Sequence, residues 1–332
     1  MRLALAFLAL LLPAPGAGAD ADSSRANIPA YRAAVPVMGQ IRLSGSPADR
    51  RLIEALESGF ASHHPDVRFS ERLHGPESTL AAVYTDVADI AFMAREIREP
   101  MERMAFEWVK LAKPFSVEIA NAGFAIDRPA HQLAVYVHQD NPLQALSLPV
   151  LEAIFGARPT RGVRKLESWG ELGLTGDWRE RPIKVFGPEL DSIDALFFRR
   201  TVMHDSRKWN PGYREFASAD ALFDALRKEP TGIAFAPFVF HHPDLRVLPL
   251  SARENGTYYA PNRETVIART YPLTRSLTVI FHRPPRESAP PAVAAFVRFL
   301  LSAEGQAIIE SESCYLPLDG ETIAAQLRRL GT

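Results

Sequence analysis

The sequence predicts an α/β protein of two domains, and three observations support this. The chain has 332 residues, more than one compact core usually holds and suited to two domains of about 100–200 residues each. Apolar residues make up 47% and charged residues 23%, near globular averages, which excludes disordered, collagen-like and coiled-coil classes. Short apolar runs alternate with segments of helical period, a pattern typical of an α/β sheet with right-handed crossovers.

The alternation begins near residue 41. A short strand over 41–43 runs into a tight turn, and the helix predicted over 51–62 places Leu52, Leu56 and Phe60 on one face. A strand follows over 67–69, and Gly75-Pro76-Glu77-Ser78 opens a second helix. The apolar run 89–94 is bounded by charges, as expected for a strand buried in a parallel sheet.

The middle and the end of the chain repeat this pattern. We expect strands over 134–138, 183–186, 232–236 and 277–281. Helices are predicted over 148–155, 192–203, 292–301 and 322–330, the first of them ending at Gly156. The sequence contains no internal repeat and no coiled-coil heptads.

The charge balance and the cysteine count exclude several classes of partner and site. Lys and Arg number 38 against 39 Asp and Glu, for a net charge of −1. No global field would therefore hold nucleic acid or an anionic membrane, and we expect neither as a partner. The single cysteine, Cys314, excludes an intramolecular disulfide and any cysteine-rich metal cage.

The N-terminus has the features of a secretory signal peptide over residues 1–19. Arg2 precedes an apolar run from Leu3 to Leu12, and the small residues Ala17-Gly18-Ala19 form an A-x-A cleavage site. The run is shorter than the roughly 20 residues that span a bilayer, so an anchor is the weaker alternative. We expect cleavage near Ala19, export to the periplasm of a Gram-negative source, and a flexible leader over residues 20–36.

Enzyme signatures are missing from the sequence. It contains no G-x-S-x-G elbow, no phosphate-binding P-loop, no G-x-G-x-x-G after a strand and no H-E-x-x-H. The pairs His63-His64 and His241-His242 each precede a proline, which is typical of surface turns rather than of metal ligands. We therefore expect a binding protein without catalytic residues, metal or cofactor.

Three strands run into Gly/Ser/Pro turns that open helices, at 44–46, 75–79 and 187–192. Such loops gather at the carboxyl edge of an open α/β sheet, where ligands bind. Helix N-termini present N–H groups and a partial positive charge, which suit an anion. The alternative for each loop is that its polar residues only cap the helix.

The chain resembles the substrate-binding proteins of ABC transporters, most closely the phosphate-binding, PstS-like branch, from about Gly39 to Leu318. The resemblance is carried by short motifs that keep the family's order and spacing. They are Leu43-Ser44-Gly45-Ser46, Val87-Ala88-Asp89-Ile90-Ala91 with Arg95-Glu96, Val135 to Pro142, Ile154-Phe155-Gly156, Trp169-Gly170-Glu171-Leu172, Gly232-Ile233-Ala234-Phe235, Tyr271-Pro272-Leu273-Thr274-Arg275 and Glu304-Gly305-Gln306.

This resemblance implies a bilobal type II periplasmic-binding-protein fold, two α/β lobes joined by a two-strand hinge. Lobe 1 would comprise residues 37–125 and 272–332, and lobe 2 residues 126–271. The chain would cross between the lobes near 122–135 and 268–279. A monomer that delivers its ligand to an ABC permease in the inner membrane is the implied assembly. The implied ligand-binding residues are Ser44, Gly45, Ser46, Glu77, Ser78, Thr79, Arg95, Asp191 and Ser192.

Several positions depart from the family's phosphate site. The departures are Ala48, Pro76, Glu77, Ala94, Pro188, Ile193 and Asp194. Glu77, Asp191 and Asp194 would repel an anion, and Pro188 stands where the family has an arginine. Phosphate is the ligand that the resemblance implies. The alternatives are another small solute, or a binding fold that has lost its phosphate site and acts as a sensor or interaction module.

Overall fold

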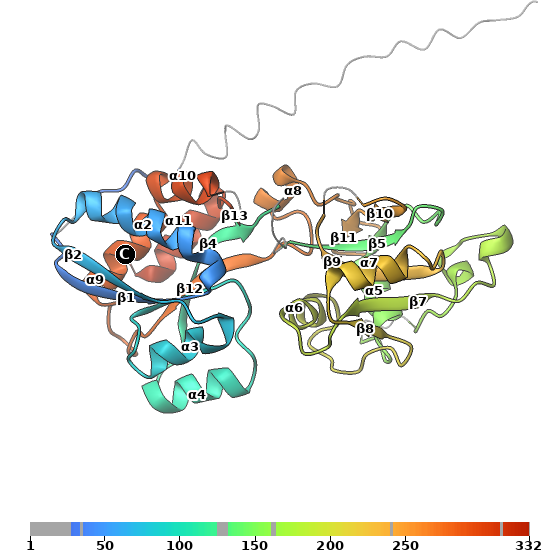
Figure 1. Cartoon of the computed structure of the whole chain (residues 1–332), viewed down its shortest axis with the longest axis horizontal. Helices are drawn as coiled ribbons and strands as arrows, with labels where there is room; N and C mark the ends of the chain where they lie inside the picture. The colour runs from blue at the N-terminus through green and yellow to red at the C-terminus, as the bar shows by residue number, and fades with distance from the viewer. Residues whose placement is uncertain are drawn as a thin grey trace, which may run out of the picture.

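A computed structural model of the chain describes residues 28–33, 36–124, 132–160, 164–239, 242–312 and 315–331. The predicted signal peptide and Cys314 lie outside these residues. Two main β-sheets, each covered by helices, form two lobes that lie side by side (Figure 1).

The sheet of the first lobe has six strands in the order β13-β4-β12-β3-β1-β2. Strand β1 pairs in parallel with β2 and β3, whereas β12 runs antiparallel between β3 and β4. A late segment of the chain therefore fills the middle of this sheet. The strands are β1 (Gly39–Ser44), β2 (Val67–Arg72), β3 (Ile90–Met93), β4 (Phe115–Ala122), β12 (Ser276–Phe281) and β13 (Tyr315–Leu316).

Helices from both ends of the chain cover this sheet. They are η1 (Pro47–Asp49), α2 (Arg50–His63), α3 (Pro76–Tyr84), α4 (Met101–Lys110), α9 (Pro291–Leu300), α10 (Ala303–Ser311) and α11 (Gly320–Leu330). Phe60 of α2 packs edge-on against Phe296 of α9, with ring centroids 5.2 Å apart. Burial of such large apolar faces is the main stabilising contribution to the lobe. We call these strands and helices lobe 1.

Lobe 2 contains a five-stranded sheet in the order β10-β5-β9-β7-β8 and a two-stranded sheet, β11-β6. Strand β7 is parallel to β8 and β9, and β5 is antiparallel to β9 and β10. Its strands are β5 (Leu133–His138), β6 (Leu146–Ser147), β7 (Lys184–Pro188), β8 (Arg214–Phe216), β9 (Gly232–Pro237), β10 (Leu245–Val247) and β11 (Leu250–Ser251). Its helices are α5 (Leu148–Phe155), η2 (Trp169–Leu172), η3 (Gly176–Trp178), α6 (Ile193–Val202), α7 (Ala219–Leu226) and α8 (Arg263–Ile267).

This architecture confirms the predicted α/β class with two lobes. The strands and helices expected from periodicity are present, most with bounds within two residues of those expected. Both main sheets are mixed rather than parallel throughout, because β12 and β5 return antiparallel to their neighbours. The lobe boundaries at residues 125 and 271 stay a prediction.

Residues 28–33, which the sequence places in a flexible leader, pack against lobe 1. The hydroxyl of Tyr31 lies 2.8 Å from Nε2 of His64, and the Tyr31 ring meets Phe299 edge-on at 5.3 Å. Ala303 N–H donates to the Pro29 carbonyl at 2.9 Å. The flexible-leader prediction therefore does not describe residues 28–33. The reason is that Tyr31 packs against Phe299, a contact between residues far apart in the sequence that local periodicity cannot predict.

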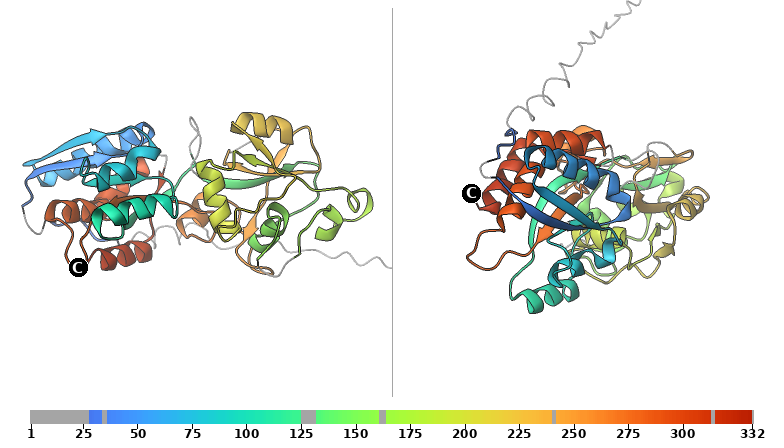
Figure 2. Two further views of the ribbon diagram at one scale, coloured as in Figure 1. Left: turned by 90° about the horizontal axis from the view of Figure 1, so that it is seen from below. Right: turned by 60° about the vertical axis from the view of Figure 1, so that its left-hand side comes forward.

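The lobes also touch away from the segments that connect them. Helix α8 of lobe 2 packs near β4 and β13 of lobe 1, and Arg263 at its start pairs with Glu310 of α10. Figure 2 shows the two lobes from below and from one side. No single helix in the described ranges is long and apolar enough to cross a membrane, although α9 and α10, bent by 62° at their junction, pass the test of length and composition together.

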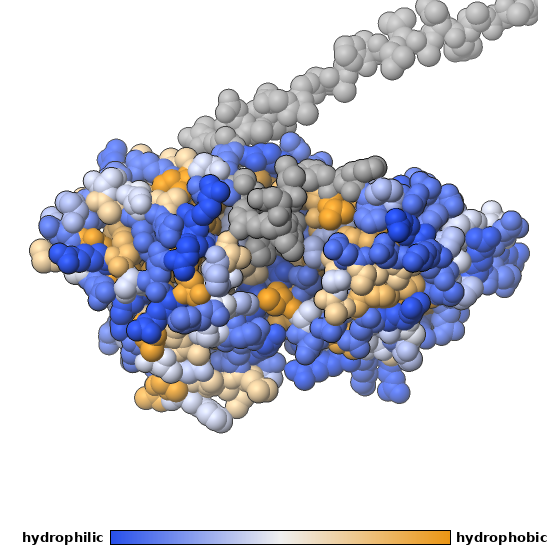
Figure 3. All heavy atoms as spheres, in the orientation of Figure 1, coloured by the Kyte–Doolittle hydropathy of each residue, from blue (hydrophilic) through white to orange (hydrophobic). Residues whose placement is uncertain are grey.

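Helix α4 exposes apolar side chains at the surface of lobe 1. Met101 is 78% exposed, Trp108 73% and Leu111, just after the helix, 83%, whereas Phe106 is buried. Figure 3 shows apolar surface over α4 at the lower left of the molecule. Single exposed apolar residues are ordinary on soluble proteins, but several on one short helix are uncommon.

Candidate functional site

The first two helix-opening loops lie against each other in lobe 1. Ser44 ends β1 and is buried, and Gly45 follows it. Gly75 N–H donates to the Gly45 carbonyl at 3.2 Å, which joins the loop after β1 to the loop before α3. Gly75 has a φ of +107°, a backbone conformation that favours glycine. The two loops therefore meet at one edge of the sheet, as the sequence predicts.

The third loop, at the start of α6 in lobe 2, reaches the second loop through an arginine. Arg98 follows β3 in lobe 1 and pairs with the carboxylate of Glu77. Another nitrogen of the same guanidinium donates to the Asp191 carbonyl at 3.3 Å. The structure thus brings all three loops to the lobe junction.

The hydroxyls of these loops make two kinds of hydrogen bond. Ser78 and Thr79 both donate to the Gly75 carbonyl, at 3.2 and 2.8 Å. Ser46 accepts from Ala48 N–H and Ser192 from Ala195 N–H, both at 3.2 Å. A hydroxyl that accepts keeps its own proton for donation. Ser46 and Ser192 can therefore cap their helices and donate to a ligand at the same time, so the capping and binding interpretations are compatible there.

Arg95 is enclosed by protein acceptors. Its side chain is 1% exposed and forms a two-pronged ion pair with Glu102 of α4, at 2.7 and 2.8 Å. The same guanidinium donates to the carbonyls of Pro76 and Glu96. Burial raises the pKa of Glu102, but the hydrogen bonds from Arg95 and from Arg98 N–H outweigh it and lower that pKa. In this structure Arg95 holds the second loop in place through its hydrogen bonds to the Pro76 carbonyl. The predicted contact between Arg95 and a ligand stays a prediction.

Arg275 joins the two lobes and is absent from the residues predicted for the site. Its guanidinium donates to Asp194 of α6 at 2.9 Å and to Glu96 of lobe 1 at 3.2 Å. It also donates to the Ile193 carbonyl at 3.0 Å and lies 5.0 Å from the ring centroid of Phe197. Burial lowers the pKa of Arg275, but Glu96 and Asp194 together outweigh it and raise that pKa.

The only sequence signal for Arg275 is its place in the motif Tyr271-Pro272-Leu273-Thr274-Arg275. The side chain is 2% exposed although it bears a full charge. A buried charge is stable only when it is paired and hydrogen-bonded. Arg275 therefore depends on contacts with both lobes at once.

The carboxylates expected to repel an anion are partly neutralised. Glu77 pairs with Arg98 and Asp194 with Arg275, while Glu96 shares Arg275. Asp191 is exposed, and its backbone carbonyl is the atom that Arg98 contacts. In the described ranges no three His, Cys, Asp or Glu side chains are placed to hold a metal ion.

A family model described as "PBP superfamily domain" matches residues 31–304. This chain belongs to the PBP superfamily. Within that superfamily, its sequence is 25% identical over 305 residues to the phosphate-binding protein PstS of Pseudomonas aeruginosa, covering 92% of this chain and 91% of that protein.

Solved structures show the same PBP fold. An ABC-type phosphate transport receptor from Vibrio cholerae matches with a TM-score of 0.57 and 19% identity, covering 84% of this chain and all of that one. PstS from Borrelia burgdorferi matches with a TM-score of 0.58 and 12% identity, covering 84% and 99%. At these identities the likeness confirms the bilobal fold that the motifs imply.

Proposed function

We propose that this PBP superfamily protein is exported, holds a small oxyanion between its lobes and passes it to an ABC permease, with phosphate as the first ligand to test. The observation that carries the proposal is the meeting of three helix-opening loops at the lobe junction. The named relatives, a phosphate-binding protein and phosphate transport receptors, support the choice of phosphate.

The proposed contacts follow from the donors at this junction. Ser46 and Ser192 each have a hydroxyl proton to donate, and the first turns of α3 and α6 present N–H groups. Arg98, 37% exposed, can move from Glu77 to an oxyanion without uncovering a buried charge. Arg275 would stay paired with its two carboxylates and shape the site without touching the ligand. Anion binding in this protein therefore exchanges one partner of Arg98 for another.

Closure of the lobes would complete the site. The proposed hinge is formed by the segments near residues 122–135 and 268–279, with Arg275 at the point where the return segment enters β12. Hinge closure around a ligand is the usual way in which two lobes exclude water from a bound ion. We further propose that the protein works as a periplasmic monomer after removal of residues 1–19.

The deciding experiment is calorimetric titration of the mature protein, residues 20–332, with phosphate. Sulfate and molybdate serve as controls of similar shape. We expect saturable binding of phosphate with a micromolar or lower Kd, which corresponds to about 8 kcal/mol or more. No heat at millimolar phosphate would contradict the proposal and favour another solute, or the sensor and interaction alternative.

Export and assembly need separate measurements. We expect the full chain to accumulate in the periplasm of a Gram-negative host as a form shortened by 19 residues, and a variant without residues 1–19 to stay in the cytoplasm. Mass spectrometry of the periplasmic form gives the cleavage site. Light scattering of that form should give the mass of one chain, and a dimer mass would contradict the monomer proposal.

A further inference from the structure

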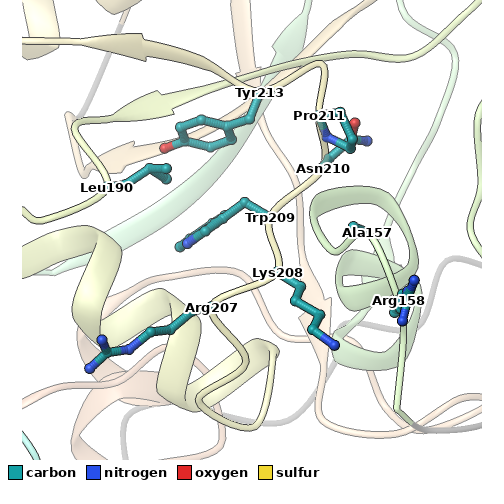
Figure 4. A pocket seen from close by; sticks show the side chains of 9 residues that line it. All are labelled: Ala157, Arg158, Leu190, Arg207, Lys208, Trp209, Asn210, Pro211 and Tyr213. Atoms are coloured by element: carbon teal, nitrogen blue, oxygen red, sulfur yellow. The ribbon is translucent and has the colours of Figure 1, made fainter.

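A cavity open to the surface lies on lobe 2, beside the third loop of the junction. Its volume is about 550 Å³, and its lining includes Arg158, Leu190, Arg207, Lys208, Trp209 and Tyr213. Figure 4 shows the rings of Trp209 and Tyr213 near Leu190, with Arg207 and Lys208 on the segment that carries Trp209 and with Arg158 on a separate segment, next to Ala157. All of these lining residues belong to lobe 2, so the cavity does not depend on how the lobes sit relative to each other.

The walls of this cavity are held by backbone hydrogen bonds. Ala157 N–H donates to the Lys208 carbonyl at 2.8 Å, and Asn210 N–H to the Phe155 carbonyl at 2.7 Å. The Tyr213 hydroxyl donates to the Pro188 carbonyl at 2.7 Å. Burial raises the pKa of Tyr213, so the phenol stays protonated and keeps this bond. The cavity is therefore formed before any ligand arrives.

Two aromatic rings form one side of the cavity. The centroids of Trp209 and Tyr213 lie 5.1 Å apart. Trp209 is also stacked on Phe198 of the lobe core, at 6.2 Å with planes 19° apart, which fixes the orientation of the indole. A half-buried indole held in this way is a suitable surface for a planar ring to stack on.

The basic side chains of the cavity lack acidic partners. Arg158, Arg207 and Lys208 are exposed, and none of them pairs with a carboxylate within the ranges that the structure describes. The arginines of the lobe junction, by contrast, are all paired. Glu215 accepts a hydrogen bond from the N–H of Leu190 at 2.8 Å, and Glu189 and Asp191 flank Leu190 in the sequence. Three basic side chains without a carboxylate partner in the described ranges therefore line this cavity.

We propose that this cavity binds a small organic anion that carries a planar ring, of the nucleoside monophosphate class. Arginine and lysine bind phosphate oxygens through charge-assisted hydrogen bonds. The ring would stack beside Trp209 and Tyr213, and an arginine next to a bound ring adds a cation–π contribution. The site is distinct from the one at the lobe junction, although Leu190 places the two close to each other.

The test uses AMP as the probe, with adenosine and ribose 5-phosphate as its two halves. Calorimetry on the mature protein should show saturable AMP binding, with each half binding at least about tenfold more weakly because it lacks either the charge or the ring. Failure of 10 mM AMP to approach saturation would overturn the proposal. Equal binding of adenosine and AMP would also overturn it.

Matched variants locate the binding. Arg207→Gln with Lys208→Gln should weaken AMP binding by about tenfold or more, whereas Lys228→Gln, an exposed lysine of the same lobe outside the cavity, should leave it unchanged. Thermal unfolding confirms that each variant is folded. A saturating concentration of inorganic phosphate should not displace AMP. Displacement, or equal affinities in all variants, would assign AMP to the lobe junction or elsewhere and overturn the proposal.

Discussion

Arg98 differs from the two other arginines of the lobe junction in its exposure. Its side chain is 37% exposed, whereas those of Arg95 and Arg275 are 1% and 2% exposed. A surface ion pair contributes at most about 1 kcal/mol, so its partner can be exchanged at little cost. Removing a partner from a buried pair costs several times more. Among these three, Arg98 is therefore the side chain suited to a ligand that binds and leaves.

Glu77→Gln is expected to tighten phosphate binding about three- to tenfold, because the anion no longer competes with a carboxylate for Arg98. Arg98→Gln should weaken binding by a similar or larger factor. Glu180→Gln, which removes an acid that is 91% exposed in lobe 2, is the matched control and should have no effect. Calorimetry on the three variants measures these changes, and an unchanged or lower affinity of Glu77→Gln would contradict the exchange.

A second residue-scale feature is the carboxylate pair Glu57 and Glu71 on α2 and β2. Burial, together with repulsion by Glu71, raises the pKa of Glu57 to about 8, from a usual value of 4.5. The folded protein therefore holds this proton more tightly than the unfolded chain does. The stability that the protonated form provides is complete below about pH 4.5 and is lost as the pH rises toward 8.

Glu57→Gln should remove this pH dependence. We expect the Tm of the natural protein to fall between pH 5.5 and pH 8.5, and that of the variant to fall less, so that the variant is the more stable protein at pH 8.5. Glu254→Gln, a substitution of an exposed carboxylate in a loop, is the control, and its Tm should depend on pH as that of the natural protein does. Calorimetric melting curves at the two pH values give the comparison, and parallel curves for Glu57→Gln and the natural protein would exclude the effect.

At the scale of elements, α4 holds the loop that opens α3. Glu102 in the first turn of α4 binds Arg95, and Arg95 donates to the Pro76 carbonyl at the start of α3. The N–H of Arg98 also donates to Glu102, at 2.7 Å. One carboxylate thus fixes the position of two arginines and, through Arg95, of a helix start.

Glu102→Gln should destabilise the protein by about 3 kcal/mol, because it leaves the buried Arg95 charge without a counter-charge. Glu99→Gln removes an exposed pair between Glu99, just before α4, and Arg103 on that helix, and it should cost about 0.5 kcal/mol or less. Urea unfolding of both variants measures the two values. Similar losses would mean that the Arg95–Glu102 pair contributes no more than a surface pair.

The elements that periodicity predicts are those with one apolar face. In α2 and α9 apolar side chains recur at helical spacing and are buried against each other. Helix α4 is not predicted by this reasoning, because Met101 and Trp108 are exposed and Phe106 is its one buried residue. Strand β4 is also missed, since Glu118 and Asn121 interrupt its apolar run.

The three loops of the site were predictable because strand ends and Gly/Ser turns are local signals. The pairing of Arg275 with Asp194 was not, because those residues are far apart in the sequence and their contact depends on how the lobes meet. The same applies to Arg95, whose local sequence gives no sign of the acid on α4 that encloses it. Charge pairing across elements is the part of this site that only the structure supplies.

At the scale of the whole molecule, Arg275 bridges lobe 1 and lobe 2 through Glu96 and Asp194. A second interlobe pair, Arg263 with Glu310, is about 40% exposed on the arginine side. The buried bridge should therefore dominate the charge interactions that set the distance between the lobes.

Arg275→Gln is expected to open the molecule, because Glu96 and Asp194 then repel each other across the junction. Small-angle X-ray scattering should show a larger radius of gyration for this variant in the absence of phosphate, with Arg263→Gln, the more exposed bridge, as the control that stays near the natural value. Identical scattering of Arg275→Gln and the natural protein would show that the Arg275 bridge does not set the distance between the lobes.

The central position of β12 has a consequence for the order in which the molecule can assemble. Lobe 2 is continuous in sequence between β5 and β11, so its sheet can form as soon as that stretch has been synthesised. Lobe 1 cannot, because β3 and β4 have no strand between them until residues 276–281 are available. Until then both strands present unpaired edges, which are sites for aggregation. In a growing chain the sheet of lobe 2 can therefore form before β12 is inserted into the sheet of lobe 1. During that interval a chaperone that covers the edges of β3 and β4 would prevent aggregation.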